Sequence, residues 1–271
     1  MSFSGTCNAT VPNDMDKTLE YTGERIIPGV SPAFFLQEHA ARYAFAARFC
    51  EGKRVLDVAS GAGYGTDYLR RKGAACTGLE IDAQAVRYAQ HWFPDSDFVC
   101  GNAEELGDEW RGQFDCVVSF ETIEHLSHPE KFLEGVSRCL RAGGIFLCST
   151  PNKNLHLLEG GHPFHKKEFY RGEFLRFIGT RFQVLDVLGQ SFHPAWHRVL
   201  FASFSLSKKL LRLARIRSLG IGATIVDKVA LSPFEGCMLQ EERVLPKFLP
   251  STISRGRIPT FMLVIAQKRN D

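Results

Sequence analysis

Three ionisable side chains follow a strongly apolar run in the middle of the chain. Glu121, Glu124 and His125 lie in the stretch Ser119-Phe-Glu-Thr-Ile-Glu-His-Leu126. If the turn is helical, the i, i+3, i+4 spacing places all three on one side of it. Two carboxylates and one imidazole form half of a site for a hard or borderline divalent ion. They also suit proton transfer, or the capping of a strand-to-helix turn before Pro129.

A second group of polar residues follows the next apolar run. It comprises Ser149-Thr-Pro-Asn152 and Gly161-His-Pro-Phe-His-Lys-Lys-Glu-Phe-Tyr-Arg-Gly-Glu-Phe174. Because the carboxyl ends of neighbouring parallel strands meet at one edge of a sheet, we expect these loops beside the first group. Imidazole is the side chain whose unperturbed pKa lies near neutrality, so without a metal the expected general base is His125, His162 or His165.

The elements that must position these residues alternate between strand and helix. Hydrophobic patterning predicts a helix from Pro32 to about Gly52, and then strands and helices in turn at 54–59, 65–72, 75–81, 83–92, 98–100, 114–120, 129–141 and 145–149. A helix near 167–178 and strands at 182–188 and 261–267 follow. Such alternation is typical of an α/β fold, in which right-handed crossovers build a mostly parallel sheet with helices on both faces.

Length and composition suit a core domain with appended parts. The chain has 271 residues, of which 44% are hydrophobic and 23% charged, and its net charge of +3 is too small to indicate a polyanionic partner. Eight scattered cysteines without a CxxC pair, together with the lack of a signal peptide or a membrane-length apolar run, predict a cytoplasmic protein. We expect a flexible tail at 1–20, a helical cover at 21–52, a core at 53–190 plus 259–271, and an inserted substrate-specificity lobe at 191–258.

A glycine-rich loop follows the first predicted strand in Val55-Leu-Asp-Val-Ala-Ser-Gly-Ala-Gly-Tyr-Gly-Thr66. Its three glycines allow a sharp turn and the close approach of a ligand. Glu80 ends the next predicted strand, where a carboxylate suits ribose hydroxyls. Asp57, just ahead of the loop, would repel a pyrophosphate but suits an ammonium or sulfonium group. This acid and the loop spacing argue against a dinucleotide-dependent dehydrogenase.

Five ordered segments resemble the motifs of class I S-adenosylmethionine (SAM)-dependent methyltransferases, namely VLDVASGAGYGT, GLEID, GNAEEL, FDCVVSFETIEHL and LRAGGIFLCSTPN. The resemblance covers about residues 53–190 and the last strand, and it implies a Rossmann-like seven-stranded sheet with SAM as cofactor. It assigns Asp57 to the cofactor's amino group and Glu80 to its ribose. The other cofactor residues that it implies are Gly61 and Gly63 under the methionyl part, Ile81, Asn102 and Ala103 at the adenine, and Ala59 and Phe120. Where the family more often has Asp, this chain has Asn102, whose side-chain oxygen can still accept a hydrogen bond.

The segments ETIEHL, TPN and HPFHKKEFYRGEF are similar to those of two groups of metal-assisted O-methyltransferases, the ubiquinone-pathway enzymes and the small-RNA terminal 2'-O-methyltransferases. The similarity implies that Mg²⁺ or Mn²⁺ is held by Glu121, Glu124, His125 and His165, with His162 the competing candidate for the fourth place. An alcohol is a poor nucleophile at neutral pH, and a divalent ion bound to its oxygen lowers its pKa and fixes its position.

Four further short segments have a less specific similarity, which indicates the class of acceptor. YTGERIIPG, EHAARYAFA, STPNK and GQS are similar to segments of methyltransferases that accompany glycosyltransferases in bacterial surface-glycan and glycosylated natural-product pathways. This similarity implies that the helix bearing His39, Arg42 and Tyr43 covers the cofactor, with Arg42 as a partner of its carboxylate; an amphipathic surface helix is the alternative. We therefore expect O-methylation of a sugar hydroxyl, with a phenolic or catechol acceptor as the first alternative and a terminal ribose of RNA as the second.

Basic residues gather in the expected inserted lobe, where Lys208, Lys209, Arg212 and Arg215 fall on one face of a predicted helix. They suit an anionic acceptor, such as a nucleotide- or lipid-linked sugar, or a membrane surface; a solvated helix face is the simpler interpretation. RNA would need a stronger basic stripe. The alternatives outside catalysis are a protein that binds the cofactor without turnover and a membrane-docking accessory subunit. The oligomeric state has no signal in the sequence.

Overall fold

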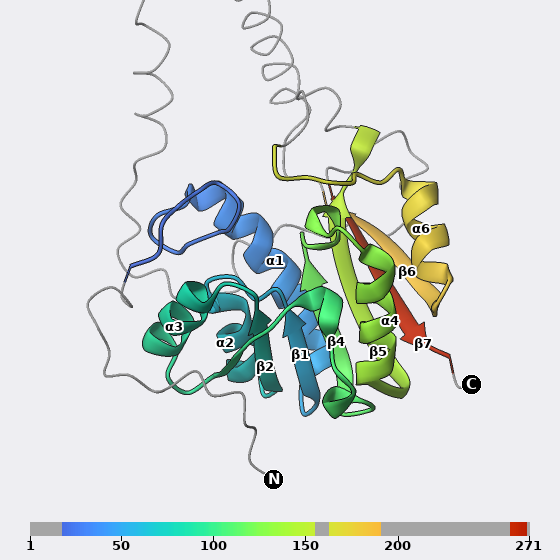
Figure 1. Ribbon diagram of the computed structural model, residues 1–271, viewed down its shortest axis with the longest axis horizontal. Coiled ribbons are helices and arrows are strands. Elements are labelled where there is room, and N and C mark those ends of the chain that lie inside the picture. Colours follow the sequence, from blue (N-terminus) through green and yellow to red (C-terminus); the bar gives the residue numbers. More distant parts are fainter. Residues whose placement is uncertain (1–17, 155–162, 191–260, 270–271) are drawn as a thin grey trace, which may run out of the picture.

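A seven-stranded sheet forms the centre of the protein (Figure 1). The structure is a computed structural model, and it describes residues 18–154, 163–190 and 261–269, apart from the side chains of residues 33 and 34. The strand order is β3-β2-β1-β4-β5-β7-β6. The strands are β1 (Arg54–Val58), β2 (Ala75–Glu80), β3 (Asp97–Cys100), β4 (Phe114–Phe120), β5 (Leu140–Pro151), β6 (Phe182–Gln190) and β7 (Phe261–Lys268).

The first five strands run parallel, whereas β7 is antiparallel to both of its neighbours, β5 and β6. Parallel strands need crossover connections, and the helices that alternate with them along the chain supply these connections. The predicted fold class, a mostly parallel seven-stranded sheet with helices on both faces, is confirmed.

Helices cover both faces of the sheet. Buried residues of α1 (Ala33–Cys50), α2 (Tyr64–Arg71) and α3 (Ala83–Trp92) pack on one face, and those of α4 (Pro129–Cys139) and α6 (Arg171–Gly179) pack on the other (Figure 1). Short 3-10 turns lie in the described loops, at η2 (Ala103–Glu105), η3 (Asp108–Trp110) and η4 (Ile123–His125). No helix within the described ranges combines the length and the apolar character needed to cross a bilayer.

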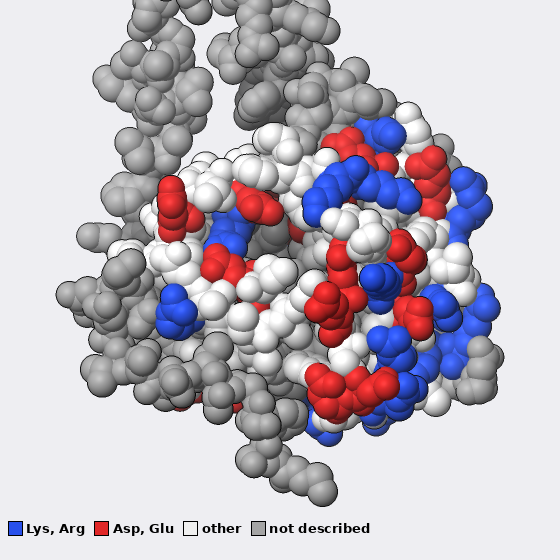
Figure 2. Space-filling model, viewed as in Figure 1, with Lys and Arg blue, Asp and Glu red and all other residues white. Residues whose placement is uncertain are grey.

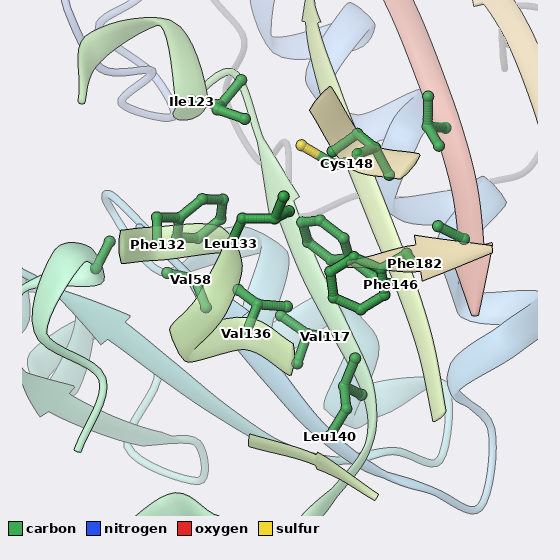
Figure 3. Close-up of a cluster of buried hydrophobic side chains, with 14 of the residues drawn as sticks. Val58, Val117, Ile123, Phe132, Leu133, Val136, Leu140, Phe146, Cys148 and Phe182 are labelled. Atoms are coloured by element: carbon green, nitrogen blue, oxygen red, sulfur yellow. The ribbon is translucent and has the colours of Figure 1, made fainter. Parts of the chain in front are cut away.

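The core on the α4 side is drawn in Figure 3. Val58 of β1, Val117 of β4 and Phe146 of β5 meet Phe132 and Val136 of α4, and all five side chains are buried. Successive strand residues point to opposite faces, so the alternate residues of the same strands enter the core beneath α1 and α2. Burial on both faces explains why these strands appear in the sequence as continuous apolar runs.

The segment before α6 departs from the expected helix near 167–178. The helix begins at Arg171, because the preceding residues bind other elements instead. The backbone amides of Lys166 and Lys167 donate to the carbonyl oxygen of Glu124 at 2.8 and 3.0 Å. Phe169 forms an isolated bridge with Asn152. These contacts fix the 163–169 segment against the carboxyl ends of β4 and β5. The predicted lobe at 191–258, with its basic helix, lies outside the described residues.

Candidate active site

Of the three glycines in the loop after β1, one opens onto free space. A Cβ built on Gly61, whose φ is +57°, would meet no atom within 4 Å. A Cβ on Gly63 would strike Ala89 and Phe98, and one on Gly65 would strike the ring of Tyr43. Gly61 is thus the position where a ligand can approach the backbone, while the other two glycines make room for packing within the protein.

Asp57 is completely buried beneath this loop. Its two carboxylate oxygens accept hydrogen bonds from the Tyr43 hydroxyl at 3.1 and 3.2 Å, and one of them also accepts from the Thr66 hydroxyl at 2.7 Å. Burial raises the pKa of Asp57 from 3.8 to about 7, although the hydrogen bonds from Thr66 and Tyr43 act in the opposite direction. A cationic group placed close to Asp57 would favour its ionised form.

Glu80, at the end of β2, is held against the same loop. Its carboxylate accepts hydrogen bonds from the backbone amides of Gly61 at 2.9 Å and Asp82 at 3.1 Å. Beside it, Ile81 is an exposed aliphatic side chain, with an exposed fraction of 65%. A carboxylate and an apolar surface therefore lie next to each other, the pairing that the ribose and adenine of SAM need. The predicted roles of Glu80 and Ile81 fit this geometry.

The remaining residues predicted for the cofactor lie around this centre. The Asn102 side chain accepts a hydrogen bond from the Glu104 amide at 2.9 Å and so caps η2, of which the buried Ala103 is the first residue. Phe120, at the end of β4, is buried, and its ring packs edge-on against Tyr43 with centroids 5.1 Å apart. Tyr43 of α1 therefore touches both the Asp57 carboxylate and the end of β4.

Among the residues that the structure describes, two that are not glycine have left-handed backbones, Ala59 with φ of 62° and Glu121 with φ of 54°. They directly follow β1 and β4, which are paired neighbours in the sheet. This conformation is costly for residues with a Cβ and is concentrated at functional sites. The expectation that Glu121 lies in one helical turn with Glu124 and His125 is wrong in geometry, since η4 begins only at Ile123.

Glu124, His125 and His165 converge. One potential ligand atom from each of the three lies within 4.8 Å of the others, and the two imidazole rings are 4.9 Å apart at an interplanar angle of 85°. Glu121 is not part of this group; its carboxylate accepts a hydrogen bond from the Ser149 hydroxyl at 2.5 Å. His162 lies outside the described residues. Three of the four predicted metal ligands are thus brought together.

Both imidazoles are oriented through Nδ1. The Nδ1 of His125 is 3.1 Å from the carbonyl oxygen of Phe164, and that of His165 is 3.0 Å from a carboxylate oxygen of Glu168. Because both partners can only accept, each Nδ1 donates the hydrogen bond, and in the neutral imidazole Nε2 then carries the lone pair. This is the usual arrangement of metal-binding histidines, whose second nitrogen donates to a carbonyl or a carboxylate.

Glu124 provides the test of whether an ion fits. Its side chain is fully buried, and one carboxylate oxygen accepts from the Thr150 hydroxyl at 2.9 Å while the other has no hydrogen-bond partner. Burial, and then the nearby Glu121, raises the pKa of Glu124. A buried carboxylate oxygen without a donor beside two oriented imidazoles suits a divalent ion such as Mn²⁺. The capping alternative finds no support, because no side chain caps η4 or α4.

Arg42 is a second buried group with unmet hydrogen bonds. One guanidinium nitrogen donates to the side-chain oxygen of Gln190 at 2.7 Å, and the group lies over the Phe261 ring at 4.6 Å. Its Nε and its other terminal nitrogen have no hydrogen-bond partner. Arg42 therefore lies where β6 ends and β7 begins, and its two unmatched donors fit a carboxylate or another anion. Its predicted role as the partner of the cofactor carboxylate stays a prediction.

Several site residues escaped the sequence analysis. Glu24 lies 4.0 Å from the Nδ1 of His125, while Arg25 pairs with Asp82 after β2. The N-terminal segment thus extends from the end of β2 to η4. No spacing of residues in the sequence predicts this position. Thr150 and Glu168 were also missed; for Glu168, the i, i+3 spacing from His165 was an available signal.

The fold and the site have the architecture of class I methyltransferases. The antiparallel seventh strand lies between β5 and β6, and the glycine loop faces an acidic residue at the end of β2. Residues 56–148 match the family model described as "Methyltransferase domain". The chain is 35% identical over 189 residues to the "Probable S-adenosylmethionine-dependent methyltransferase" of Mycolicibacterium smegmatis, an alignment that covers 68% of this chain and 72% of that protein.

Two further comparisons also match this chain to methyltransferases. A ubiquinone biosynthesis O-methyltransferase of Erwinia tasmaniensis is 28% identical, with 56% of this chain and 70% of that protein covered. The crystal structure of a SAM-dependent methyltransferase from Thermotoga maritima superposes with a TM-score of 0.56 at 14% identity, covering 88% of this chain and 94% of that one, and supports the fold. The chain belongs to the SAM-dependent methyltransferases and is an enzyme that uses SAM.

Proposed function

We propose that this enzyme is a divalent-metal-assisted O-methyltransferase that methylates a sugar hydroxyl of a glycan or of a glycosylated natural product. The observation that carries the proposal is the convergence of Glu124, His125 and His165, with potential ligand atoms within 4.8 Å of one another. A methyltransferase that acts on an already nucleophilic amine or thiol has little need of such a group, whereas one that acts on a hydroxyl must make its oxygen more nucleophilic.

One group of side chains binds the cofactor, and a second group acts on the acceptor hydroxyl. SAM supplies the methyl group on a sulfonium centre. Glu80 and Ile81 hold its nucleoside part, and the Gly61 backbone lies under its methionyl part. A divalent ion would lower the pKa of the acceptor hydroxyl and fix its oxygen. Glu124 would hold that ion through a carboxylate oxygen, and His125 and His165 would hold it through Nε2. In the transfer a C–O bond forms and the C–S bond breaks, its electron pair stays on sulfur, and the hydroxyl proton passes to water.

The N-terminal segment supports a saccharide acceptor. Its YTGERIIPG stretch is similar to that of glycan-pathway methyltransferases, and its Glu24 and Arg25 lie beside His125 and Asp82. The matching segment is therefore at the site and not remote from it. Vicinal sugar hydroxyls can also chelate an ion through two oxygens, which suits a site with three protein ligands.

A phenolic or catechol acceptor is the second candidate, and the ubiquinone biosynthesis O-methyltransferases among the relatives favour it. Adjacent aromatic hydroxyls can chelate an ion in the same way as sugar hydroxyls, so the metal group does not separate the two classes. A terminal ribose of RNA is the third candidate, and the net charge of +3 argues against it.

The test is a methyl-transfer screen with labelled SAM over nucleotide sugars, glycans and catechols, with and without divalent ions. We expect turnover with a saccharide, its loss in excess chelator, and its recovery with Mg²⁺ or Mn²⁺. Glu124→Gln and His165→Ala should lower the turnover number at least about a hundredfold, because each removes a ligand. The affinity for SAM, measured by calorimetry, should stay within about twofold.

The matched control is Glu130→Gln on α4, a carboxylate whose side chain is exposed and lies 3.4 Å from the Nδ1 of His128. It should leave turnover unchanged. Full activity in excess chelator would remove the metal from the proposal, and so would a loss of SAM affinity in step with activity in the Glu124 and His165 variants. Turnover with catechols but with no saccharide would favour the second candidate.

A further inference from the structure

An open pocket of about 510 Å³ lies beside the Glu124–His125–His165 group, between the end of β5 and α6. Its lining is strongly basic. Four cations contribute to it against two carboxylates, together with two phenylalanines: Lys153, Lys166, Lys167, Arg176, Glu168, Glu173, Phe169 and Phe177. In Figure 2, blue side chains gather in this region, over the segment that leads into α6.

Three of the four cations contact aromatic rings or a hydroxyl. Lys153 lies over the ring of Tyr170 at 5.0 Å, Lys167 lies over those of Phe169 and Phe177 at 5.0 and 5.7 Å, and Lys166 donates to the Ser127 hydroxyl at 2.8 Å. In the part of the chain that the structure describes, neither these three nor Arg176 forms an ion pair. Aromatic faces and a hydroxyl orient the ammonium groups but do not neutralise their charge.

The two carboxylates of the pocket are already engaged elsewhere. Glu168 accepts from the Nδ1 of His165 at 3.0 Å. Glu173 accepts from the backbone amide of Tyr170 at 3.1 Å and so closes a capping box at the start of α6. Both carboxylates orient a site histidine or a helix, and with four cations against two carboxylates the lining keeps a net charge of +2.

The pocket is joined rigidly to the candidate metal group. The backbone amides of Lys166 and Lys167 donate to the Glu124 carbonyl, and the Lys153 amide donates to the carbonyl of Phe169 at 3.1 Å. Glu168 lines the pocket and also orients His165. Backbone hydrogen bonds therefore fix the distance between an anionic group bound in the pocket and the side chains of Glu124 and His165.

From these observations we infer that the pocket binds a phosphate ester group of the acceptor, so that the substrate is a phosphorylated saccharide. The inference rests on the proposed function and narrows its substrate class. The phosphate can belong to a soluble nucleoside diphosphate sugar or to a polyprenyl phosphate carrier in a membrane. Both sources present phosphate oxygens that can accept hydrogen bonds from the four cations of the pocket. Lys153 is half-buried, and Lys166, Lys167 and Arg176 are exposed.

The experiment measures binding to the full chain without any need for turnover. Uridine diphosphate is titrated by calorimetry, and vesicles with and without polyprenyl phosphate are titrated by co-sedimentation. We expect one of the two probes to bind, with an affinity that falls as salt rises from about 50 to about 200 mM. The double variant Lys153→Gln, Arg176→Gln should weaken this binding at least about tenfold. The matched control is Arg171→Gln, a cation of the same helix that does not line the pocket.

Which probe binds identifies the source of the phosphate. Failure of both probes overturns the inference, and so does binding that the double variant leaves intact or that Arg171→Gln weakens equally. Unchanged SAM affinity in all variants shows that they are folded. Methylation of a neutral glycan at the same rate as of its phosphorylated counterpart would overturn the inference and leave the proposed function standing. Phosphate binding without methylation of any saccharide would reject the proposed function and, with it, the phosphorylated saccharide as substrate, and would leave only the phosphate site.

Discussion

Asp57 should make the stability of this enzyme fall as pH rises toward neutrality. Its carboxyl is completely buried, and its pKa is raised from 3.8 to about 7. Between those two pH values the unfolded chain has an ionised Asp57 while the folded protein keeps it protonated, so the folded state binds more protons. Stability therefore decreases with rising pH across this window, by about 4 kcal/mol in all. About 2.5 kcal/mol of that loss should occur between about pH 5 and about pH 8.

The assay compares the free energy of urea unfolding of the wild type with that of Asp57→Asn over this pH range. The asparagine cannot ionise, so the difference between the two proteins isolates the titration of Asp57 from that of every other group. The substitution carries a roughly pH-independent cost of about 1 kcal/mol, because an amide offers a single acceptor oxygen to Tyr43 and Thr66. On top of this cost, the variant should gain about 2.5 kcal/mol relative to the wild type as pH rises from about 5 to about 8.

A difference that stays flat with pH would refute the reasoning, since it would mean that Asp57 titrates alike in the folded and unfolded states. The cofactor gives an independent check. If the ammonium or sulfonium of SAM lies near Asp57 as predicted, its binding favours the ionised carboxylate, so SAM affinity should rise between about pH 6 and about pH 8. Asp57→Asn should abolish that rise.

Other side chains give further tests. Gly65→Ala should destabilise the fold by about 2 kcal/mol or more in urea unfolding, because its Cβ would strike the Tyr43 ring. Gly179→Ala, at a position with nothing within 4 Å, should change stability by less than about 1 kcal/mol, and equal effects of the two would contradict this account. Thr150→Val removes a hydrogen bond that lowers the pKa of Glu124, so the pH midpoint of Mn²⁺ binding, followed by electron paramagnetic resonance, should move upward; an unmoved midpoint would exclude Glu124 as a ligand.

Much of the fold was predictable because the strands are buried on both faces. Such strands appear as apolar runs with sharp ends, and the predicted runs at 54–59, 75–81 and 114–120 lie within one residue of β1, β2 and β4. The start of α6 was not predictable from local pattern. The residues before Arg171 have helical spacing, but they are held by hydrogen bonds to Glu124, about forty positions away in the chain.

In the candidate site, too, some features were predictable from the sequence and others were not. Glu124, His125 and His165 were identifiable because ETIEHL and HPFHKKEFYRGEF are similar to segments of metal-assisted O-methyltransferases. The left-handed backbone of Glu121 was not, since local spacing favoured a helical turn. Nor could the sequence indicate that position 65 needs a glycine because of the Tyr43 ring and not because of a ligand. The two residues belong to different elements, which meet only in the folded protein.

The position of β7 has a consequence for how the enzyme is made. β7 lies between β5 and β6 and pairs with both, yet residues 261–268 leave the ribosome several seconds after residue 190. Until then one hydrogen-bonding edge of β5 and one of β6 stay open, and such edges readily pair with other chains. Arg42 also lacks Phe261, the ring beneath its guanidinium. The nascent chain therefore passes through an interval in which open strand edges make it prone to aggregate, and the arrival of a single strand ends that interval.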